Sequence, residues 1–479
     1  MNTLFSVAQI REIERAAYAQ LPPGTLMQRA GAASARLALE LMPSPHGLCK
    51  VLVLAGPGDN GGDALDCAAR LAQAGMQVSA LLFAQDKNPS NDAKMALLRA
   101  QGSAVNFIDP ASMGEATSAI TSTRWNLVVD GLFGIGLTRP IVGALHSLIE
   151  SINHFHCTVL SLDVPSGLDA DSGNVVGPHG LAVRASHTIT FIGDKPGLHT
   201  GQGRDHAGVV HVARLEIDGK LYKPSHVDIG QVSLFARYLH ARPHHCHKGN
   251  FGNVVVVGGA SGMAGAALLA AHTALKTGAG RTFIAFAADV GHYPNVDLVQ
   301  PEIMCRHAPD MDFHQSVLVI GPGLGTSRLA CELVERALGS ASPIVIDADA
   351  LNLIALEESL QQQLQARRAI TLLTPHPLEA ARLLGHLAGN AELVQKDRLG
   401  AARELARRFN ASVILKGSGS VIANAHGHVV INPTGNPALA TGGTGDVLAG
   451  LCGALLAQHW PEWEAALAGC WIHGAAADA

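Results

Sequence analysis

The stretch KVLVLAGPGDNGGDALDCAARLAQAGMQVSALLF occupies residues 50–83 and decides the class of fold. Its first residues, KVLVLA (50–55), are typical of a buried strand, and its last, QVSALLF (77–83), of a second strand. The apolar residues between them fall on one face of a helix: Leu65, Ala68, Ala69 and Ala72. A strand, a helix and a strand in succession predict a mostly parallel sheet that is covered by helices on both sides.

The same alternation continues through both halves of the chain. In the N-terminal half, the further expected strands are WNLVVD (125–130), CTVLSLDV (157–164) and HTITFI (187–192). In the C-terminal half, they are GNVVVVGGA (252–260), RTFIAFA (281–287), SVLVIG (316–321), SPIVIDADA (342–350), AITLLTP (369–375) and SVILKG (412–417). Because 479 residues exceed one ordinary core, we expect two three-layer α/β/α domains, residues 1–220 and 247–479, with a linker at 221–246.

The composition excludes several classes of protein. A net charge of −5 and 4% aromatic residues provide neither a basic stripe nor stacking platforms for nucleic acid. The eight cysteines form no C-x-x-C pair, which is typical of a reducing compartment. No window of about 18 residues is apolar enough to span a bilayer. We expect a cytoplasmic homo-oligomer that acts on small molecules, with no nucleic-acid and no membrane partner.

The first residues, MNTLFSVAQIREIERAAYAQ (1–20), carry charges where a signal peptide would be apolar. They predict a helix with Ser6 as its N-cap. The apolar residues of this helix lie on one face: Val7, Ile10, Ile13 and Ala17.

A histidine-rich tract, HARPHHCHKG (240–249), falls in the expected linker. Histidine and cysteine are metal ligands, but their spacing here matches no zinc module. We therefore interpret the tract as solvated linker rather than as a metal site.

The loop AGPGDNGGD (55–63) joins the first clear strand to its helix and contains a G-x-G-x-x-G pattern, the dinucleotide fingerprint. Two features oppose a simple pyrophosphate loop. Pro57 removes a backbone donor, and the carboxylates of Asp59 and Asp63 would repel phosphate. A cation between these oxygens and the ligand would remove the conflict.

Three further loops of the N-terminal half supply suitable oxygens: VVDGLFGIGLTRP (128–140), SLDVPSGLDAD (161–171) and FIGDKPGLHTG (191–201). Asp130 and Asp163 end two neighbouring strands, so both are expected to point into one crevice at the carboxyl edge of the sheet. The alternative is that both only cap helices or turns.

These loops resemble the signature loops of the NAD(P)H-hydrate epimerases over roughly residues 5–215. The resemblance implies a Rossmann-like domain in which Asn60, Asp130 and Ser166 hold a potassium ion. It also implies a set of residues around the hydrated nicotinamide nucleotide: Asp59, Asn60, Gly61, Gly62, Asp63, Gly134, Ile135, Gly136, Leu137, Thr138, Arg139, Pro140 and Asp163. Asp163 is the first candidate for acid–base catalysis and Lys195 the second. Asp59 departs from the asparagine common in the family, which leaves open that this half is only a binding module.

The strongest signal in the chain is NPTGNPALATGGTGDVLAGLCGALLAQ (432–458), in which a glycine-rich run leads directly into an apolar helix. Successive glycines let backbone N–H groups converge, and a helix start favours negative charge. This combination predicts an anion hole for a transferring phosphoryl group. Asp446, at the helix start, would then take a proton from the attacking hydroxyl. The alternative is a simple N-terminal helix residue.

Other segments agree with phosphoryl transfer. Lys416, in LKGSGSVI (415–422), follows a strand and is suited to nucleotide phosphates. Asp347 and Asp349, in IDADALNLI (346–354), are possible magnesium carboxylates. GPGLGT (321–326) and TPHPLEA (374–380) also follow strands.

GGTGD with these companions resembles the ribokinase-like superfamily and, more narrowly, the ADP- or ATP-dependent NAD(P)H-hydrate dehydratases over about residues 247–475. The resemblance implies a ribokinase-like C-terminal domain with Ala266, Gly323 and His376 at the hydrated nicotinamide and Asp446 at its hydroxyl. The residues implied at the adenine nucleotide are Lys416, Gly417, Ser418, Gly419, Ser420 and Gly445.

Both halves together resemble the bifunctional NAD(P)H-hydrate repair enzymes. We therefore expect epimerisation of the R and S hydrates by the first domain, with K⁺, and nucleotide-dependent dehydration by the second, with Mg²⁺ and ADP or ATP. The alternatives are a ribokinase-type small-molecule kinase and a nicotinamide oxidoreductase. Family members usually continue beyond WIHGAAADA (471–479), so a closing helix is expected to be absent.

Overall fold

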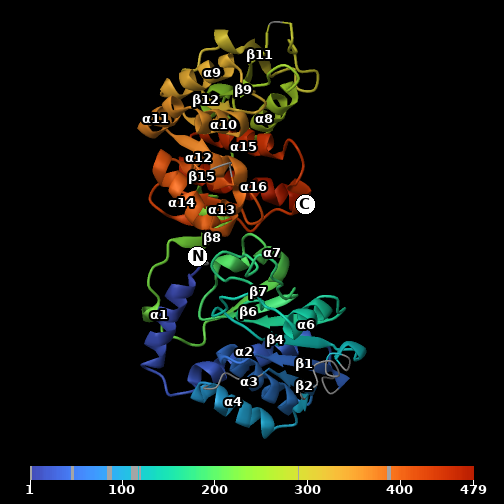
Figure 1. Cartoon of the computed structure of the whole chain (residues 1–479). Helices are drawn as coiled ribbons and strands as arrows, with labels where there is room; N and C mark the ends of the chain where they lie inside the picture. The colour runs from blue at the N-terminus through green and yellow to red at the C-terminus, as the bar shows by residue number, and fades with distance from the viewer. Residues whose placement is uncertain are drawn as a thin grey trace. The chain divides into compact units, whose positions relative to one another are not determined.

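The computed structural model describes residues 3–44, 48–83, 89–108, 117, 120–289, 291–385 and 390–479 (Figure 1). The chain divides into two compact units, one ending at Ser225 and the other beginning at His226. The expected linker at 221–246 is therefore divided between the units. Residues 221–225 belong to the N-terminal unit, and residues 226–246, which include a strand of the second sheet, belong to the C-terminal unit.

Among the described residues of the N-terminal unit, one sheet of seven parallel strands runs in the order β3-β2-β1-β4-β5-β6-β7. The strands are β1 (Lys50–Ala55), β2 (Gln77–Leu82), β3 (Asn106–Ile108), β4 (Leu127–Gly131), β5 (Thr158–Leu162), β6 (His187–Phe191) and β7 (Val209–Ala213). The order reverses between β1 and β4, and ligands of parallel sheets bind at such switch points.

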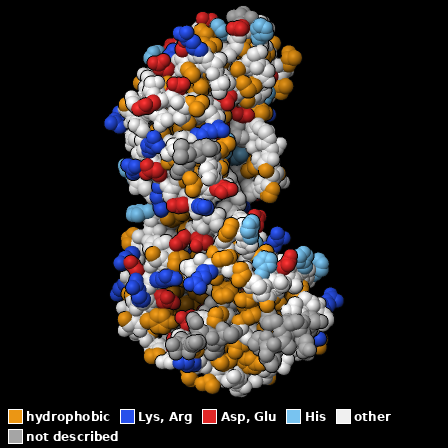
Figure 2. Space-filling model, viewed as in Figure 1, with side chains coloured by type: hydrophobic (Ala, Val, Ile, Leu, Met, Phe, Trp, Pro, Cys, Tyr) orange, Lys and Arg blue, Asp and Glu red, His pale blue; other side chains and the backbone are white. Residues whose placement is uncertain are grey.

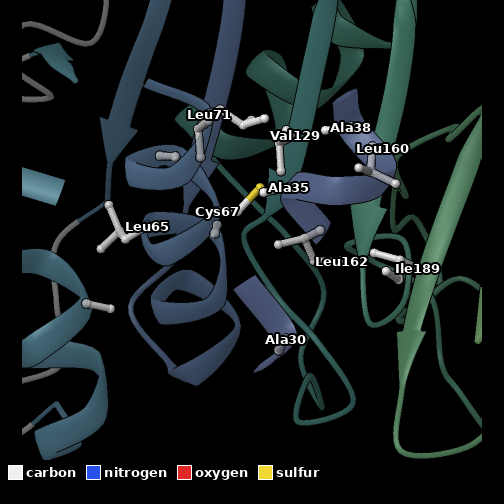
Figure 3. Packing of buried hydrophobic residues seen from close by; sticks show 14 of the residues in the cluster. Ala30, Ala35, Ala38, Leu65, Cys67, Leu71, Val129, Leu160, Leu162 and Ile189 are labelled. Atoms are coloured by element: carbon white, nitrogen blue, oxygen red, sulfur yellow. The ribbon is translucent and has the colours of Figure 1, made fainter. Parts of the chain in front are cut away.

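Helices cover both faces of this sheet. They are α1 (Val7–Tyr18), α2 (Thr25–Leu41), α3 (Asp59–Gln73), α4 (Asn91–Gln101), α6 (Ala144–Ile152) and α7 (Gly203–His206). On one face, α2 and α3 pack small side chains such as Ala35 and Cys67 against Val129 and Leu160 of the strands (Figure 3). On the other face, Leu148 of α6 joins a separate cluster with Leu52 of β1.

Among the described residues of the C-terminal unit, the sheet has ten strands in the order β11-β10-β9-β12-β13-β14-β15-β16-β17-β8. They are β8 (Val227–Ile229), β9 (Asn253–Gly258), β10 (Arg281–Phe286), β11 (Met304–His307), β12 (Val317–Ile320), β13 (Ile344–Ile346), β14 (Thr371–Leu373), β15 (Ser412–Leu415), β16 (Val421–Ala423) and β17 (Val429–Ile431). The sheet is parallel from β11 to β15, whereas β16 is antiparallel to both its neighbours. The order again reverses, between β9 and β12.

The helices of this unit are α8 (Ala264–Thr277), α9 (Arg328–Gly339), α10 (Ala348–Leu356), α11 (Glu358–Ala366), α12 (Pro377–Leu383), α13 (Ala391–Lys396), α14 (Arg398–Phe409), α15 (Thr444–Ala457) and α16 (Glu462–Asp478). Helices α8, α15 and α16 pack on one face of the sheet in a single apolar cluster with Val254 and Val256 of β9. The alternating residues of β9, Val255 and Val257, are equally buried and face the other layer.

The prediction of a two-domain α/β protein is confirmed, and each expected strand is present. Edge strands β3, β7, β8 and β11 were not predicted, and neither were β16 and β17, because short runs such as Asn106–Ile108 carry little periodic signal. The predicted first helix is α1, and Ser6 caps it with a capping box. No helix within the described ranges is both long and apolar enough to cross a membrane. Basic and acidic side chains are interspersed on the face shown in Figure 2.

Candidate functional site

A cavity of about 720 Å³ lies at the carboxyl ends of β1, β4, β5 and β6 in the N-terminal unit. It brings together most of the residues that sequence analysis assigned to the hydrated nucleotide. The assigned residues that line it are Asp59, Asn60, Asp63, Gly134, Ile135, Gly136, Leu137, Thr138, Arg139, Pro140 and Asp163. Gly61 and Gly62 are buried in the first turns of α3 instead.

Asp163 follows β5 and faces this cavity with a φ of +67°, a left-handed conformation that aspartate adopts more readily than most residues. One carboxylate oxygen accepts a hydrogen bond from the amide of Ile135 at 3.0 Å, and the other lies 2.9 Å from Nζ of Lys195. Lys195 is fully buried, and its Nζ also donates to Oγ1 of Thr190 at 2.5 Å. Lys195 therefore lies behind Asp163 and orients its carboxylate.

Asp130 does not line the cavity, although the sequence placed it in the same crevice as Asp163. Its buried carboxylate accepts hydrogen bonds from Oγ of Ser166 at 2.6 Å, from the amide of Ser166 at 2.9 Å and from Oγ of Ser161 at 2.8 Å. Burial raises the pKa of Asp130 despite these bonds. Asp130 therefore ties β4 to the loop after β5 from beneath the cavity.

Asn60, which lines the cavity, has an unsatisfied side-chain oxygen. Its amide nitrogen donates to the carbonyl of Leu162 at 3.2 Å. Its Oδ1 is buried and has no hydrogen-bond partner among the residues that the structure describes. A buried oxygen without a donor costs free energy unless a ligand satisfies it.

Carboxyl groups crowd the cavity. Burial raises the pKa of Asp63 well above its usual value, and the negative charges of Asp163 and Asp59 add to the effect. Burial and the same two carboxylates also raise the pKa of Glu14, which reaches the cavity from α1. So much negative charge at the site favours a bound cation.

In the C-terminal unit, α15 begins at Thr444 directly after Gly443, whose φ is +92°. The first N–H groups of a helix have no partner within it, so those of α15 are available to an anion. Asp446 lies in this first turn. Burial and the nearby charge of Asp347 raise the pKa of Asp446 to about 6, with Lys416 opposing the shift.

Lys416 and Asp347 form an ion pair next to this helix start. Nζ of Lys416 lies 2.8 Å from Oδ1 of Asp347, which also accepts a hydrogen bond from Oγ1 of Thr374 at 2.8 Å. A Cβ on Gly445 would lie 3.2 Å from Nζ of Lys416 and 3.7 Å from Oδ2 of Asp347. The structure thus brings Lys416, Asp347 and the start of α15 together. Although burial opposes it, Asp347 and Glu379 raise the pKa of Lys416.

The rest of the predicted nucleotide loop follows Lys416. Gly417 and Gly419 have φ values of +140° and +58°, which favour glycine. Oγ of Ser420 donates to the carbonyl of Gly417 at 3.1 Å and closes the turn. Ser418 lies between the two glycines.

His376 is the N-cap of α12. Its Nδ1 accepts from the amide of Leu378 at 3.1 Å, so Nε2 carries the proton, and this nitrogen lies 3.2 Å from Oε1 of Glu379. Burial lowers the pKa of His376 and raises that of Glu379 to about 7. Glu379 therefore changes its protonation state close to neutral pH.

Ala266 and Gly323 are also brought together, as a Cβ on Gly323 would lie 3.1 Å from Cβ of Ala266. Oδ2 of Asp349 accepts a hydrogen bond from the amide of Gly325 at 2.8 Å. Asp349 therefore braces this loop, whereas Asp347 faces the start of α15.

Sequence reasoning missed several residues at these two sites. Arg11, Glu14 and Tyr18 of α1 line the N-terminal cavity, and their spacing of three and four residues on a capped helix was a usable signal. Glu379 lies in the quoted TPHPLEA segment, where the H-x-x-E spacing marks a capping box. For the histidine-rich tract, the described residues contain no group of three or more metal-ligating side chains that could hold an ion.

Two family models match the chain. Residues 254–479 match the model described as NAD(P)H-hydrate dehydratase, and residues 23–197 match the one described as YjeF-related protein N-terminus. The chain is 35% identical to the bifunctional NAD(P)H-hydrate repair enzyme Nnr of Coxiella burnetii, over 100% of this chain and 95% of that protein. The chain belongs to the family of bifunctional NAD(P)H-hydrate repair enzymes.

A second bifunctional repair enzyme is similar to this chain over most of its length. The repair enzyme Nnr of Escherichia coli is 35% identical over 95% of this chain and 84% of its own. Among solved structures, the ADP/ATP-dependent NAD(P)H-hydrate dehydratase of Bacillus subtilis, co-crystallized with ATP/Mg²⁺, is 32% identical, with a TM-score of 0.44 over 50% of this chain and 84% of that one.

Proposed function

We propose that this chain repairs hydrated NADH and NADPH with two sites. The N-terminal unit interconverts the R and S hydrates, and the C-terminal unit dehydrates the S hydrate with phosphoryl transfer from ADP or ATP. Membership of the repair family supports both activities. The observation that carries the proposal is Asp446 beside Lys416 and Gly445 at the start of α15.

The chemistry of dehydration requires a better leaving group. Hydration places a hydroxyl on the ring carbon beside the nitrogen, and hydroxide leaves poorly. Asp446 takes the proton of this hydroxyl while the hydroxyl oxygen attacks the terminal phosphoryl group of the nucleotide. The N–H groups at the start of α15 and the charge of Lys416 stabilise the migrating phosphoryl group. The nitrogen lone pair then expels phosphate and forms a C=N bond, and loss of a proton from the adjacent ring carbon restores the C=C double bond.

The raised pKa of Asp446 suits this role. With a pKa of about 6, its carboxylate is mostly ionised at neutral pH and is more basic than an ordinary aspartate. Lys416 forms an ion pair with the neighbouring Asp347. This pairing limits how far the negative charge of Asp347 opposes the ionisation of Asp446.

Two metal ions fit the residues present. Oδ2 of Asp347 faces Gly445, where a carboxylate can hold Mg²⁺ through water; Asp349 is committed to Gly325. Magnesium would neutralise charge on the nucleotide phosphates. In the N-terminal unit, the orphaned Oδ1 of Asn60 fits K⁺, with Asp130 and Ser166 as further oxygens. Potassium would offset the crowded carboxylates.

The test incubates purified R and S hydrates with ADP or ATP and follows the return of absorbance by the reduced nicotinamide. The wild-type chain is expected to consume both epimers. Asp446→Asn should lower dehydration by ~10²–10⁴-fold, the usual span for a general base, while an epimerisation assay without nucleotide stays active. Dehydration by Asp446→Asn at the wild-type rate would remove Asp446 from this role. A stable phosphorylated product without returning absorbance would indicate a kinase instead.

A further inference from the structure

Helix α1 forms one wall of the N-terminal cavity, although the matched family model begins only at residue 23. Four residues of this helix line the cavity together with the loops that follow the strands: Ile10, Arg11, Glu14 and Tyr18. The buried side of α1, Ile10, Ile13 and Ala17, packs into the main core of the unit. The helix is therefore a fixed part of the site.

Several contacts fix α1 to the segment that carries Lys195, the partner of Asp163. The amide of Phe5 donates to the carbonyl of Asp194 at 2.8 Å. A Cβ on Gly193 would lie 2.6 Å from the ring of Phe5, so the two segments are in close contact. The amide of Val7 donates to Oδ1 of Asp171 at 2.8 Å. The position of α1 is thus coupled to that of the Asp163–Lys195 pair.

Glu14 differs from the other glutamates of this region. Its side chain is half-buried, and among the described residues its carboxyl group makes no hydrogen bond and no ion pair. The charged groups that act on it are Asp163, Asp59, Arg11 and Lys195. Glu12, two residues earlier, is instead an outward-facing partner of Lys223 at 2.9 Å. An unpaired carboxyl group at a polar cavity is free to act on a ligand.

From this placement we infer that Glu14, which reaches the cavity from α1, is a second catalytic acid–base residue of the epimerase besides Asp163, which follows β5. The inference rests on the proposed epimerisation. Inverting the hydroxyl-bearing carbon requires a hydroxyl to leave from one face of the ring and another to arrive at the opposite face. One carboxyl group cannot serve both faces, but two that enter the cavity from different elements, α1 and the end of β5, can.

The step balances with water as the only exchanged species. The protonated carboxyl of Glu14 gives its proton to the hydroxyl as the C–O bond breaks, and the ring-nitrogen lone pair forms a C=N bond. Water leaves. A second water attacks the carbon from the opposite face while Asp163 takes a proton from this water. The π electrons of the C=N bond then return to nitrogen as its lone pair. The reverse reaction exchanges the roles of Glu14 and Asp163.

The experiment uses the full chain and starts from pure R hydrate without nucleotide, with the uncatalysed rate subtracted. Wild type is tested first, since a chain that does not interconvert the epimers contradicts the proposed function itself. Glu14→Gln should lower the kcat for epimerisation by ~10²–10³-fold, as expected for loss of an acid–base group, with KM little changed. Glu12→Gln, on the same helix, is the matched control and should behave as wild type.

A second measurement stays informative if Glu14→Gln does not fold, which its thermal unfolding would reveal. Wild type in H₂¹⁸O should place one ¹⁸O in the product for each inversion, because the arriving hydroxyl comes from solvent. Retention of the original oxygen would overturn the two-carboxyl step, as would a folded Glu14→Gln chain with wild-type kcat. Partial activity in Glu14→Asp is expected, since the acid is kept and only its reach is shortened.

Discussion

At the scale of single residues, the C-terminal site depends on the balance of charge around Asp446. Asp347 raises the pKa of Asp446, and Lys416 lowers it. Lys416 is held by Oδ1 of Asp347, which is itself fixed by Thr374. These side chains follow β13, β14 and β15. The pKa of Asp446, a residue of α15, is therefore set by side chains at the carboxyl edge of the sheet.

The pKa of about 6 predicts the pH dependence of dehydration. A base acts only when deprotonated, and a raised pKa keeps Asp446 protonated up to higher pH than usual. The kcat should therefore rise with pH through about 6 and level off above it. Single-turnover rates between acid and neutral pH measure this limb. A rate already level near pH 4, the range of an ordinary aspartate, would contradict the assignment.

The sequence identified the residues with distinctive motifs and missed those that only the fold brings near. Asp446 follows a glycine-rich run, whereas Lys416 and Asp163 follow strands and precede glycine-containing loops, and chemistry at strand ends is a general rule of such sheets. Glu14 lies far from those loops in the chain, and only the packing of α1 places it at the cavity. The sequence analysis placed Asp130 in the crevice, whereas its carboxylate is buried beneath the cavity and bonded to Ser161 and Ser166. A sequence does not show which hydrogen-bond donors surround a carboxylate.

At the scale of elements, the proposed anion hole depends on how closely α15 packs on α8. A Cβ on Gly450 would lie 2.1 Å from the carbonyl oxygen of Ala270, so the two helices touch through backbone atoms. At Gly443 a Cβ would lie 2.6 Å from Leu269 of α8. The glycines of α15 therefore set the position of its first turn.

Gly450→Ala should destabilise the C-terminal unit, because the added methyl group must push α15 and α8 apart. Overpacking of this kind costs about 1–3 kcal/mol, and it should also slow dehydration. Denaturant unfolding and kcat measure the two effects. Gly265→Ala on α8 is the control: a Cβ there meets nothing within 4 Å, and alanine in a helix gains about 0.5–1 kcal/mol over glycine. Equal stability of both variants would exclude the close contact.

The longer, buried strands of each sheet were predictable, whereas most edge strands and the three-residue strands β16 and β17 were not. Central strands such as β1 and β9 are buried on both faces and read as continuous apolar runs. Strand β8 has only three residues and lay inside the expected linker. It is held by pairing with β17, about two hundred residues later, which no local pattern reveals.

At the scale of the whole molecule, one chain carries two α/β units, each with a switch point in its strand order. Each unit gathers its polar side chains where those strands end. The proposed reactions are complementary, because a stereospecific dehydratase leaves one epimer unused unless a second site interconverts them. The boundary at Ser225 and His226 keeps β8 with the sheet that it completes.

The central claim is that Asp446 directs a phosphoryl group onto the hydroxyl of the hydrate. The most direct test follows that oxygen, using S hydrate labelled with ¹⁸O at the hydroxyl and unlabelled ATP. The chain should carry Asp163→Asn, so that the N-terminal unit does not exchange the label. We predict that the released phosphate contains the ¹⁸O, because the hydroxyl oxygen leaves bonded to phosphorus. Label found in water, with unlabelled phosphate, would contradict the account.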